Sequence, residues 1–146
     1  MKSLHIFILF ALFMLGAAKK SGKLTPADKC RENIKTPQDE QCIGYCEYVH
    51  YKMISKDFKL ETRHINQYKN VLVKYNGIDK AKANELLQLI KSCASKLKIT
   101  KDMNRNDKCK QVTKYYQCIV VDSNLLEYDR YAQAMIAYDA TIKLKP

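Results

Sequence analysis

Six cysteines are the residues whose type and spacing point most directly to chemistry in this chain. They could form three disulfides or hold a metal ion, because thiolates do both. The usual zinc motif separates two cysteines by two residues, but Cys42 and Cys46 are separated by three. Apart from a histidine near the N-terminus, only His50 and His64 could add ligands. We therefore predict three disulfides and no metal site, with the cysteines at Cys30, Cys42, Cys46, Cys93, Cys109 and Cys118.

Basic side chains are concentrated in one segment of the chain. Between Lys91 and Lys114 there are eight basic residues and only two acidic ones, Asp102 and Asp107. Such a surface attracts polyanions, because neutralising several backbone charges releases condensed counterions. Lysines are point charges that suit nonspecific polyanions, so we expect no base-specific nucleic-acid partner. The predicted polyanion-binding residues are Lys91, Lys96, Lys98, Lys101, Arg105, Lys108, Lys110 and Lys114.

The same charges have a plainer interpretation, in which they only solvate the outer faces of amphipathic helices. The whole chain has a formal net charge of +11, so basic residues are expected on much of its surface. Charge alone supports the two interpretations about equally.

The N-terminal residues are expected to direct export. Residues 1–18 place Lys2 before an apolar run, Leu4 to Leu15, that ends in small residues, which is typical of a secretory signal peptide. The oxidising compartment that follows export favours disulfides. We interpret residues 19–24 as a flexible basic arm and residues 25–146 as one domain. Membrane insertion is not expected, because no later apolar run approaches about 20 residues.

The elements that must position these side chains are predicted to be helices, giving an all-α bundle of about six. Thr25 with Pro26 and Thr36 with Pro37 are typical helix starts. Further caps are expected at Thr62, Asp79 and near Asp107. Apolar residues recur at spacings of three and four throughout, and no segment alternates with a period of two. The first predicted helix begins at Pro26. The other five cover Pro37 to about Met53, Thr62 to Tyr75, Asp79 to Leu97, Lys108 to about Val121 and about Leu126 to Ile142.

Tyrosines are placed on the inner faces of these helices, at Tyr68, Tyr75, Tyr131 and Tyr138. We interpret them as core residues; the alternative is that they line a pocket for a small amphipathic ligand such as an amine or a lipid mediator. The two later histidines are expected to be surface or packing residues. No phosphate loop, zinc spacing or nucleophile motif is present, so we expect neither enzymatic activity nor a cofactor.

The cysteine spacing resembles that of the insect odorant-binding protein superfamily. Three residues separate Cys42 from Cys46, and eight separate Cys109 from Cys118, while six cysteines alone would allow 15 pairings. The resemblance covers nearly all of residues 25 to 142 and implies a compact helical bundle. Only eleven residues precede Cys42 after the first cysteine, so we expect part of the usual cavity wall to be missing. The implied disulfides are Cys30–Cys46, Cys42–Cys109 and Cys93–Cys118.

A narrower resemblance is carried by the short first gap, the basicity and two runs, Cys46 to Tyr51 and Tyr115 to Cys118. They look like the small salivary odorant-binding-like proteins of blood-feeding sand flies. The resemblance implies secretion in saliva and binding of the polyanionic surfaces that start contact coagulation. The implied partners are sulfated glycans, polyphosphate or activating surfaces, with direct capture of a host clotting factor as a further possibility. The alternative is a carrier of small hydrophobic or amine ligands that sequesters host mediators.

Overall fold

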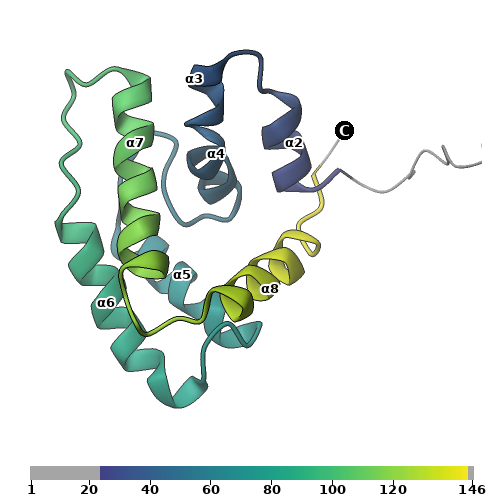
Figure 1. Cartoon of the computed structure of the whole chain (residues 1–146), viewed down its shortest axis with the longest axis vertical. Helices are drawn as coiled ribbons and strands as arrows, with labels where there is room; N and C mark the ends of the chain where they lie inside the picture. The colour runs from purple at the N-terminus through teal and green to yellow at the C-terminus, as the bar shows by residue number, and fades with distance from the viewer. Residues whose placement is uncertain (1–23, 145–146) are drawn as a thin grey trace, which may run out of the picture.

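The computed structural model describes residues 24–144, and every regular element in that range is helical. The helices form a single bundle, in which α4 packs against both α2 and α7 while α5, α6 and α8 close the other end (Figure 1). No helix in this range is long and apolar enough to span a membrane. The predicted signal peptide and most of the basic arm lie outside the described residues. The elements are α2 (Pro26–Glu32), α3 (Pro37–Glu40), α4 (Ile43–His50), α5 (Thr62–Lys74), η1, a 3-10 turn (Lys80–Lys82), α6 (Ala83–Ser95), α7 (Arg105–Tyr116), η2, a π-helical turn (Gln117–Val121) and α8 (Tyr128–Asp139).

Three disulfides cross-link the bundle, in the pairing that the family resemblance implies. The bridge between Cys42 and Cys109 joins the start of α4 to α7 across 67 residues of sequence. It closes the longest of the three loops, which corresponds to about 4 kcal/mol of loop-closure entropy. The all-α bundle with three disulfides is confirmed, and the bridges are Cys30–Cys46, Cys42–Cys109 and Cys93–Cys118.

The first helix starts follow the predicted local chemistry. The Thr25 hydroxyl accepts the N–H of Asp28 at 3.2 Å, and the Thr36 hydroxyl accepts the N–H of Asp39 at 3.3 Å. Both threonines are followed by a proline and complete a capping box. The prediction of a cap near Asp107 is wrong, because the N-cap of α7 is Asn104, three residues earlier.

The predicted helix from Pro37 to Met53 is two helices, α3 and α4, so that prediction is wrong. The chain leaves regular geometry at Cys42, whose φ is −99° and ψ is 3°. After α4, Lys52 adopts a left-handed φ of 60°, and the N–H of Met53 bonds to the carbonyl of Tyr48 at 2.8 Å. This is a Schellman ending, which lysine has no intrinsic preference to form, so the sequence did not indicate it.

Three other helices differ from the predictions at one or both ends. The N-cap of α5 is Glu61 rather than Thr62, and Asp79 makes no side-chain capping bond. The carboxylate of Asp79 instead pairs with Arg130 on α8 at 2.9 Å. The fourth predicted helix begins as the 3-10 turn η1 and ends at Ser95, and α8 is shorter than expected at both ends. Local sequence patterns did not predict the pairing of Asp79 with Arg130, because the two residues lie far apart in the chain.

The end of α7 widens into the π-helical turn η2. Ile119 and Val120 are adjacent in the sequence, and both are buried. The inward tyrosine is Tyr115, which is 1% exposed, while Tyr116 is half-buried. A π turn adds a residue per turn, so two consecutive apolar side chains can reach the core.

A tyrosine cluster fills the interior of the bundle. The hydroxyl groups of Tyr48, Tyr68 and Tyr131 lie 2.6 to 3.4 Å from one another. Burial raises the pKa of Tyr131 to about 12, so the group stays neutral at physiological pH. Tyr68 and Tyr131 are core residues as predicted, whereas Tyr75 and Tyr138 are half-buried around them.

Candidate functional site

The end of α6 and the segment after it lie against α7. The Cys93–Cys118 disulfide makes the covalent link between α6 and η2. The ammonium Nζ of Lys96 lies 3.9 Å from Sγ of Cys118, and the backbone N–H of Lys98 donates to Oε1 of Gln111 at 3.4 Å. Two basic residues at the start of the α6–α7 connection are therefore placed along one side of α7.

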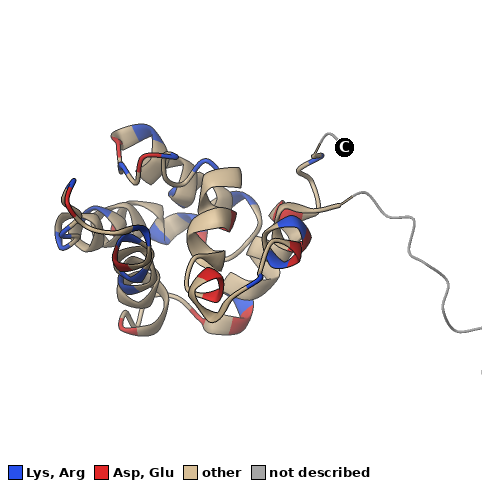
Figure 2. Cartoon of the chain, turned by 90° about the horizontal axis from the view of Figure 1, so that it is seen from above, with Lys and Arg blue, Asp and Glu red and all other residues tan. Residues whose placement is uncertain are grey.

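Two lysines of α7 share that side. Gln111, Lys114 and Cys118 recur at spacings of three and four, so they lie on one face, and Lys110 is one turn before Lys114. Four exposed lysines thus lie along one side of α7, and we call them the lysine patch: Lys96, Lys98, Lys110 and Lys114. Lys110 pairs with Asp107 at 3.1 Å; among residues 24–144 the other three form no ion pair. Basic positions on α7 and the preceding connection are interspersed with acidic ones in Figure 2.

The other predicted basic residues are directed elsewhere. Arg105 faces α3, where it pairs with Asp39 at 3.7 Å. Lys108 is half-buried, with Nζ 5.9 Å from the ring centre of Phe58, and it donates to the carbonyl of Lys101 at 3.4 Å. Lys91 is exposed on α6, but it lies five positions before Lys96, which is about 140° around a helix. The structure therefore gathers only part of the basic segment into one surface.

The histidines are packing residues, as the sequence indicated. His64 is 5% exposed, and its Nδ1 accepts the N–H of Glu61 at 3.0 Å. Burial lowers the pKa of His64, and nearby Arg63 adds to the effect. His50 lies near the Cys30–Cys46 bridge, with ligand atoms of all three residues within 4.8 Å of one another. The sulfurs are already joined, so this group lacks the thiolates that a metal ion requires.

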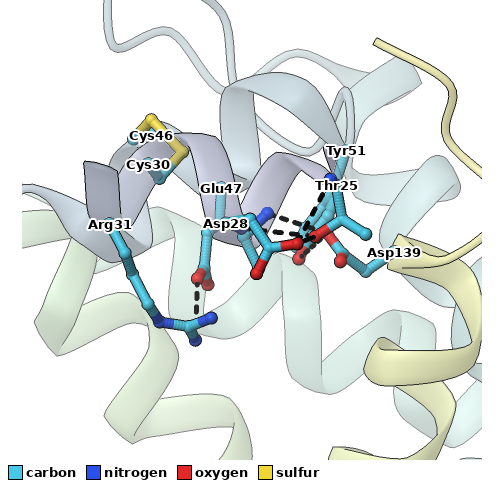
Figure 3. Close-up of a disulfide and its surroundings, with 9 residues drawn as sticks. Thr25, Asp28, Cys30, Arg31, Cys46, Glu47, Tyr51 and Asp139 are labelled. Atoms are coloured by element: carbon cyan, nitrogen blue, oxygen red, sulfur yellow. Dashed lines mark hydrogen bonds and ion pairs between the residues drawn. A yellow bond between two sulfur atoms is a disulfide. The ribbon is translucent and has the colours of Figure 1, made fainter. Parts of the chain in front are cut away.

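An open groove of about 1040 Å³ lies beside the lysine patch, between α2, α4, α7 and α8. Lys110 and Lys114 line one side of it, and Glu47 and Asp139 line the other. Figure 3 shows Glu47 on α4, close to the disulfide between α2 and α4, with Arg31 reaching its carboxylate. The sequence analysis missed both acids. Glu47 sits next to Cys46, and Asp139 follows a predicted inward tyrosine, but neither position carries a motif.

The acidic side of the groove is electrostatically unusual. Burial raises the pKa of Glu47, Arg31 opposes the shift, and the nearby charge of Asp139 raises it slightly more. The pKa of Tyr51 is also raised, first by burial and then by Glu47 and Asp139. Negative charge is thus held in a poorly solvated place on the surface of a strongly basic protein.

A small, basic, all-helical domain with three disulfides is typical of proteins that work outside the cell. The chain is 30% identical to Salivary protein 15a and to Salivary protein 15b, both from Phlebotomus duboscqi. Each of these matches covers 99% of this chain and the full length of the relative. The chain is also 32% identical to Ayaconin from Lutzomyia ayacuchensis, across 83% of this chain and 81% of that protein.

The chain therefore belongs to a family of sand fly salivary proteins that includes Salivary protein 15a. No family model matches it. Salivary relatives and three disulfides are both consistent with secretion. Membership in the odorant-binding superfamily stays a prediction from cysteine spacing.

Proposed function

We propose that this protein is a secreted, non-enzymatic salivary protein that binds polyanionic polymers and surfaces and so inhibits contact-pathway coagulation in the host. The observation that carries the proposal is the lysine patch, in which lysines from two separate segments lie along one side of α7. Its preferred partners are sulfated glycans, polyphosphate or activating surfaces, which carry closely spaced anionic groups.

The geometry of the patch suits an extended polyanion. Three of its four ammonium groups form no ion pair among the described residues, so little internal pairing must be broken when an anion binds. The disulfide between Cys93 and Cys118 fixes α6 to η2, which reduces the conformational entropy lost on binding. Lysine, as a point charge on a long side chain, selects for charge density and not for a particular sequence of groups.

Salt dependence follows from this mechanism. Each phosphate or sulfate that is neutralised releases condensed counterions, so the logarithm of affinity should fall linearly with the logarithm of salt concentration. A patch that engages about four anionic groups should lose affinity steeply on that scale. A binding site for a clotting factor that relied on apolar contacts would respond much less.

Heparin chromatography provides the direct test. A variant in which Lys96, Lys98, Lys110 and Lys114 are replaced by glutamate should elute at clearly lower salt than the original protein. The matched control replaces four exposed lysines away from the patch by glutamate, at Lys56, Lys59, Lys80 and Lys82.

Both variants undergo the same change in net charge, so only the position of the charge differs. A larger loss for the patch variant supports the proposal, provided that thermal unfolding shows both variants to be folded. Equal elution of the two variants would mean that overall charge, and not this patch, determines binding.

A further inference from the structure

The groove between α2, α4, α7 and α8 has the size and lining of a ligand site. Its volume of about 1040 Å³ is at the upper end of the range found for small-molecule pockets. Two large side chains at its edge, Tyr128 and Ile136, are 62% and 69% exposed. They are among the few large apolar side chains in residues 24–144 that face solvent so openly, so the groove offers an apolar entrance.

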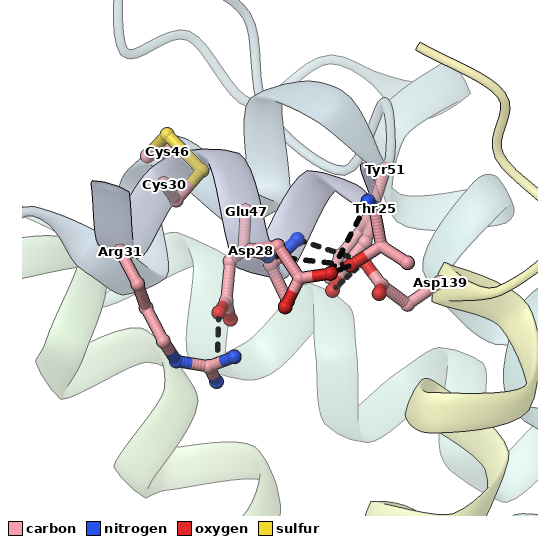
Figure 4. Close-up of polar contacts among 9 residues, drawn as sticks. Thr25, Asp28, Cys30, Arg31, Cys46, Glu47, Tyr51 and Asp139 are labelled. Carbon is pink, nitrogen blue, oxygen red and sulfur yellow. Dashed lines mark hydrogen bonds and ion pairs between the residues drawn. A yellow bond between two sulfur atoms is a disulfide. The ribbon is translucent and has the colours of Figure 1, made fainter. Parts of the chain in front are cut away.

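A buried carboxylate lies at one end of the groove. Asp139 is only 7% exposed, and its Oδ1 accepts two hydrogen bonds, from the N–H of Ala27 at 3.0 Å and the hydroxyl of Tyr51 at 2.9 Å (Figure 4). Within residues 24–144, Oδ2 forms no hydrogen bond and no ion pair. A carboxylate that is nine-tenths buried, with one oxygen still free to accept a hydrogen bond, favours a cationic partner. Glu47 adds a second carboxylate along the same wall, where its one cationic partner is the largely exposed Arg31.

Aromatic rings line the groove next to these carboxylates. Tyr48, Tyr51, Tyr116 and Tyr131 all contribute to it, together with Met135. Ammonium groups bind well over aromatic faces, and the attraction is larger where water is excluded. The lining therefore combines buried negative charge, π-faces and apolar contact area.

Two other kinds of occupant fit less well. Among the described residues, no three carboxylates bring their oxygens within 4.8 Å of one another, so the acids are too dispersed to enclose a metal ion. An anionic lipid would have to use Arg31, Lys110 and Lys114, all of which are exposed, and the first two already have an acidic partner. Exposed charges are screened by salt much more strongly than a buried carboxylate.

We propose that the groove binds an organic ammonium compound with an aromatic or apolar body, its cationic group at Asp139 and Glu47. The body of the ligand lies against the tyrosine rings and Met135. This activity is independent of polyanion binding, because it uses charge of the opposite sign on the other side of the groove. The two can be measured separately, since binding at a buried carboxylate persists at salt concentrations that release polyanions.

Three indole compounds that differ mainly in charge provide the test: tryptamine, which is cationic, tryptophol, which is neutral, and indole-3-acetate, which is anionic. The chain contains no tryptophan, so indole fluorescence can be excited selectively and its anisotropy used to follow binding. At a salt concentration that elutes the protein from heparin, tryptamine should bind at least about tenfold more tightly than either analogue. Comparable binding of tryptophol, or tighter binding of indole-3-acetate, would overturn the proposal.

Two variants locate the site. Asp139→Asn keeps an oxygen that can accept the Tyr51 hydroxyl but removes the charge, and Glu47→Gln is a second variant in case the first does not fold. Each should weaken tryptamine binding about tenfold or more and leave heparin elution unchanged. Asp129→Asn, an exposed acid on the same helix α8 that does not line the groove, is the matched control. Unchanged tryptamine affinity in a folded Asp139 or Glu47 variant would contradict the site.

Discussion

The ammonium group of Lys96 lies 3.9 Å from the sulfur of Cys118, although 22 residues separate them in the sequence. The contact exists because the disulfide partner of Cys118 is Cys93, three residues before Lys96 on α6. A structural cross-link and a candidate binding charge are therefore parts of the same local arrangement, and a change in one should alter the other.

Removal of this disulfide should weaken heparin binding without any change in charge. In the variant with Cys93→Ala and Cys118→Ala, the end of α6 is no longer fixed to η2, so Lys96 and Lys98 lose their defined positions beside α7. Elution from heparin should move to lower salt. The control carries Cys30→Ala and Cys46→Ala, which releases α2 from α4 and leaves the patch in place. Elution should be measured at a temperature at which circular dichroism shows both variants to be folded. Equal shifts in the elution salt of the two variants would argue against a preorganised patch.

Inhibition of clotting should depend on the trigger. If the protein covers activating surfaces, it should prolong the clotting time of plasma started with kaolin or polyphosphate and leave clotting started with tissue factor unchanged. The variant with glutamate at Lys96, Lys98, Lys110 and Lys114 should lose this effect, because its patch repels polyanions. Prolongation of both clotting times would indicate a target later in the cascade.

The two glycines of the described region should respond oppositely to alanine. A Cβ at Gly77 would lie 2.9 Å from Cβ of Ala134 and 3.0 Å from Cδ2 of Leu72, so α8 would have to move away from the end of α5. We expect Gly77→Ala to lower the free energy of unfolding by about 1–3 kcal/mol. A Cβ at Gly44 in α4 would meet no tertiary neighbour within 4 Å, so Gly44→Ala should be neutral or stabilising by up to about 1 kcal/mol. Denaturant unfolding measures both, and equal destabilisation would contradict the packing at Gly77.

His64 should make the fold less stable in mild acid. Its pKa is lower in the folded protein than the usual 6.5, so the unfolded chain binds the proton more readily. Stability contributed by the neutral form is complete above pH 6.5 and declines as the pH falls through that value toward the folded pKa. His64→Gln keeps a side chain that can accept the Glu61 N–H and cannot titrate in this range.

The comparison of His64→Gln with the original protein isolates this contribution. The variant should gain relative stability between about pH 7.5 and pH 5, as measured by the thermal midpoint. Asp79→Asn serves as a control, because pairing with Arg130 lowers the pKa of Asp79 from an ordinary value of 3.8, below this pH interval. If the thermal midpoints of His64→Gln and the original protein differ by the same amount at every pH, His64 does not cause the loss of stability in mild acid.

Local sequence chemistry determined the parts of this protein that depend on neighbours in the chain. The three- and four-residue spacing of apolar side chains predicted an all-helical chain, and Thr25 and Thr36 were identified as caps because each precedes a proline at the first helical position. An even number of cysteines behind a predicted signal peptide indicated three disulfides. Their pairing was implied only by the family resemblance, since cysteine count and spacing alone leave many pairings open.

Tertiary structure decided what depends on residues far apart in the chain. It selected four of the eight predicted basic residues for one patch, because Lys96 and Lys98 reach α7 only through the Cys93–Cys118 link. It also placed Asp139 against the start of α2, 112 residues away, and so formed the acidic side of the groove, which no sequence motif indicates. Periodicity shows which face of a helix is apolar, but it does not specify which helix covers that face or which charges meet across the gap between them.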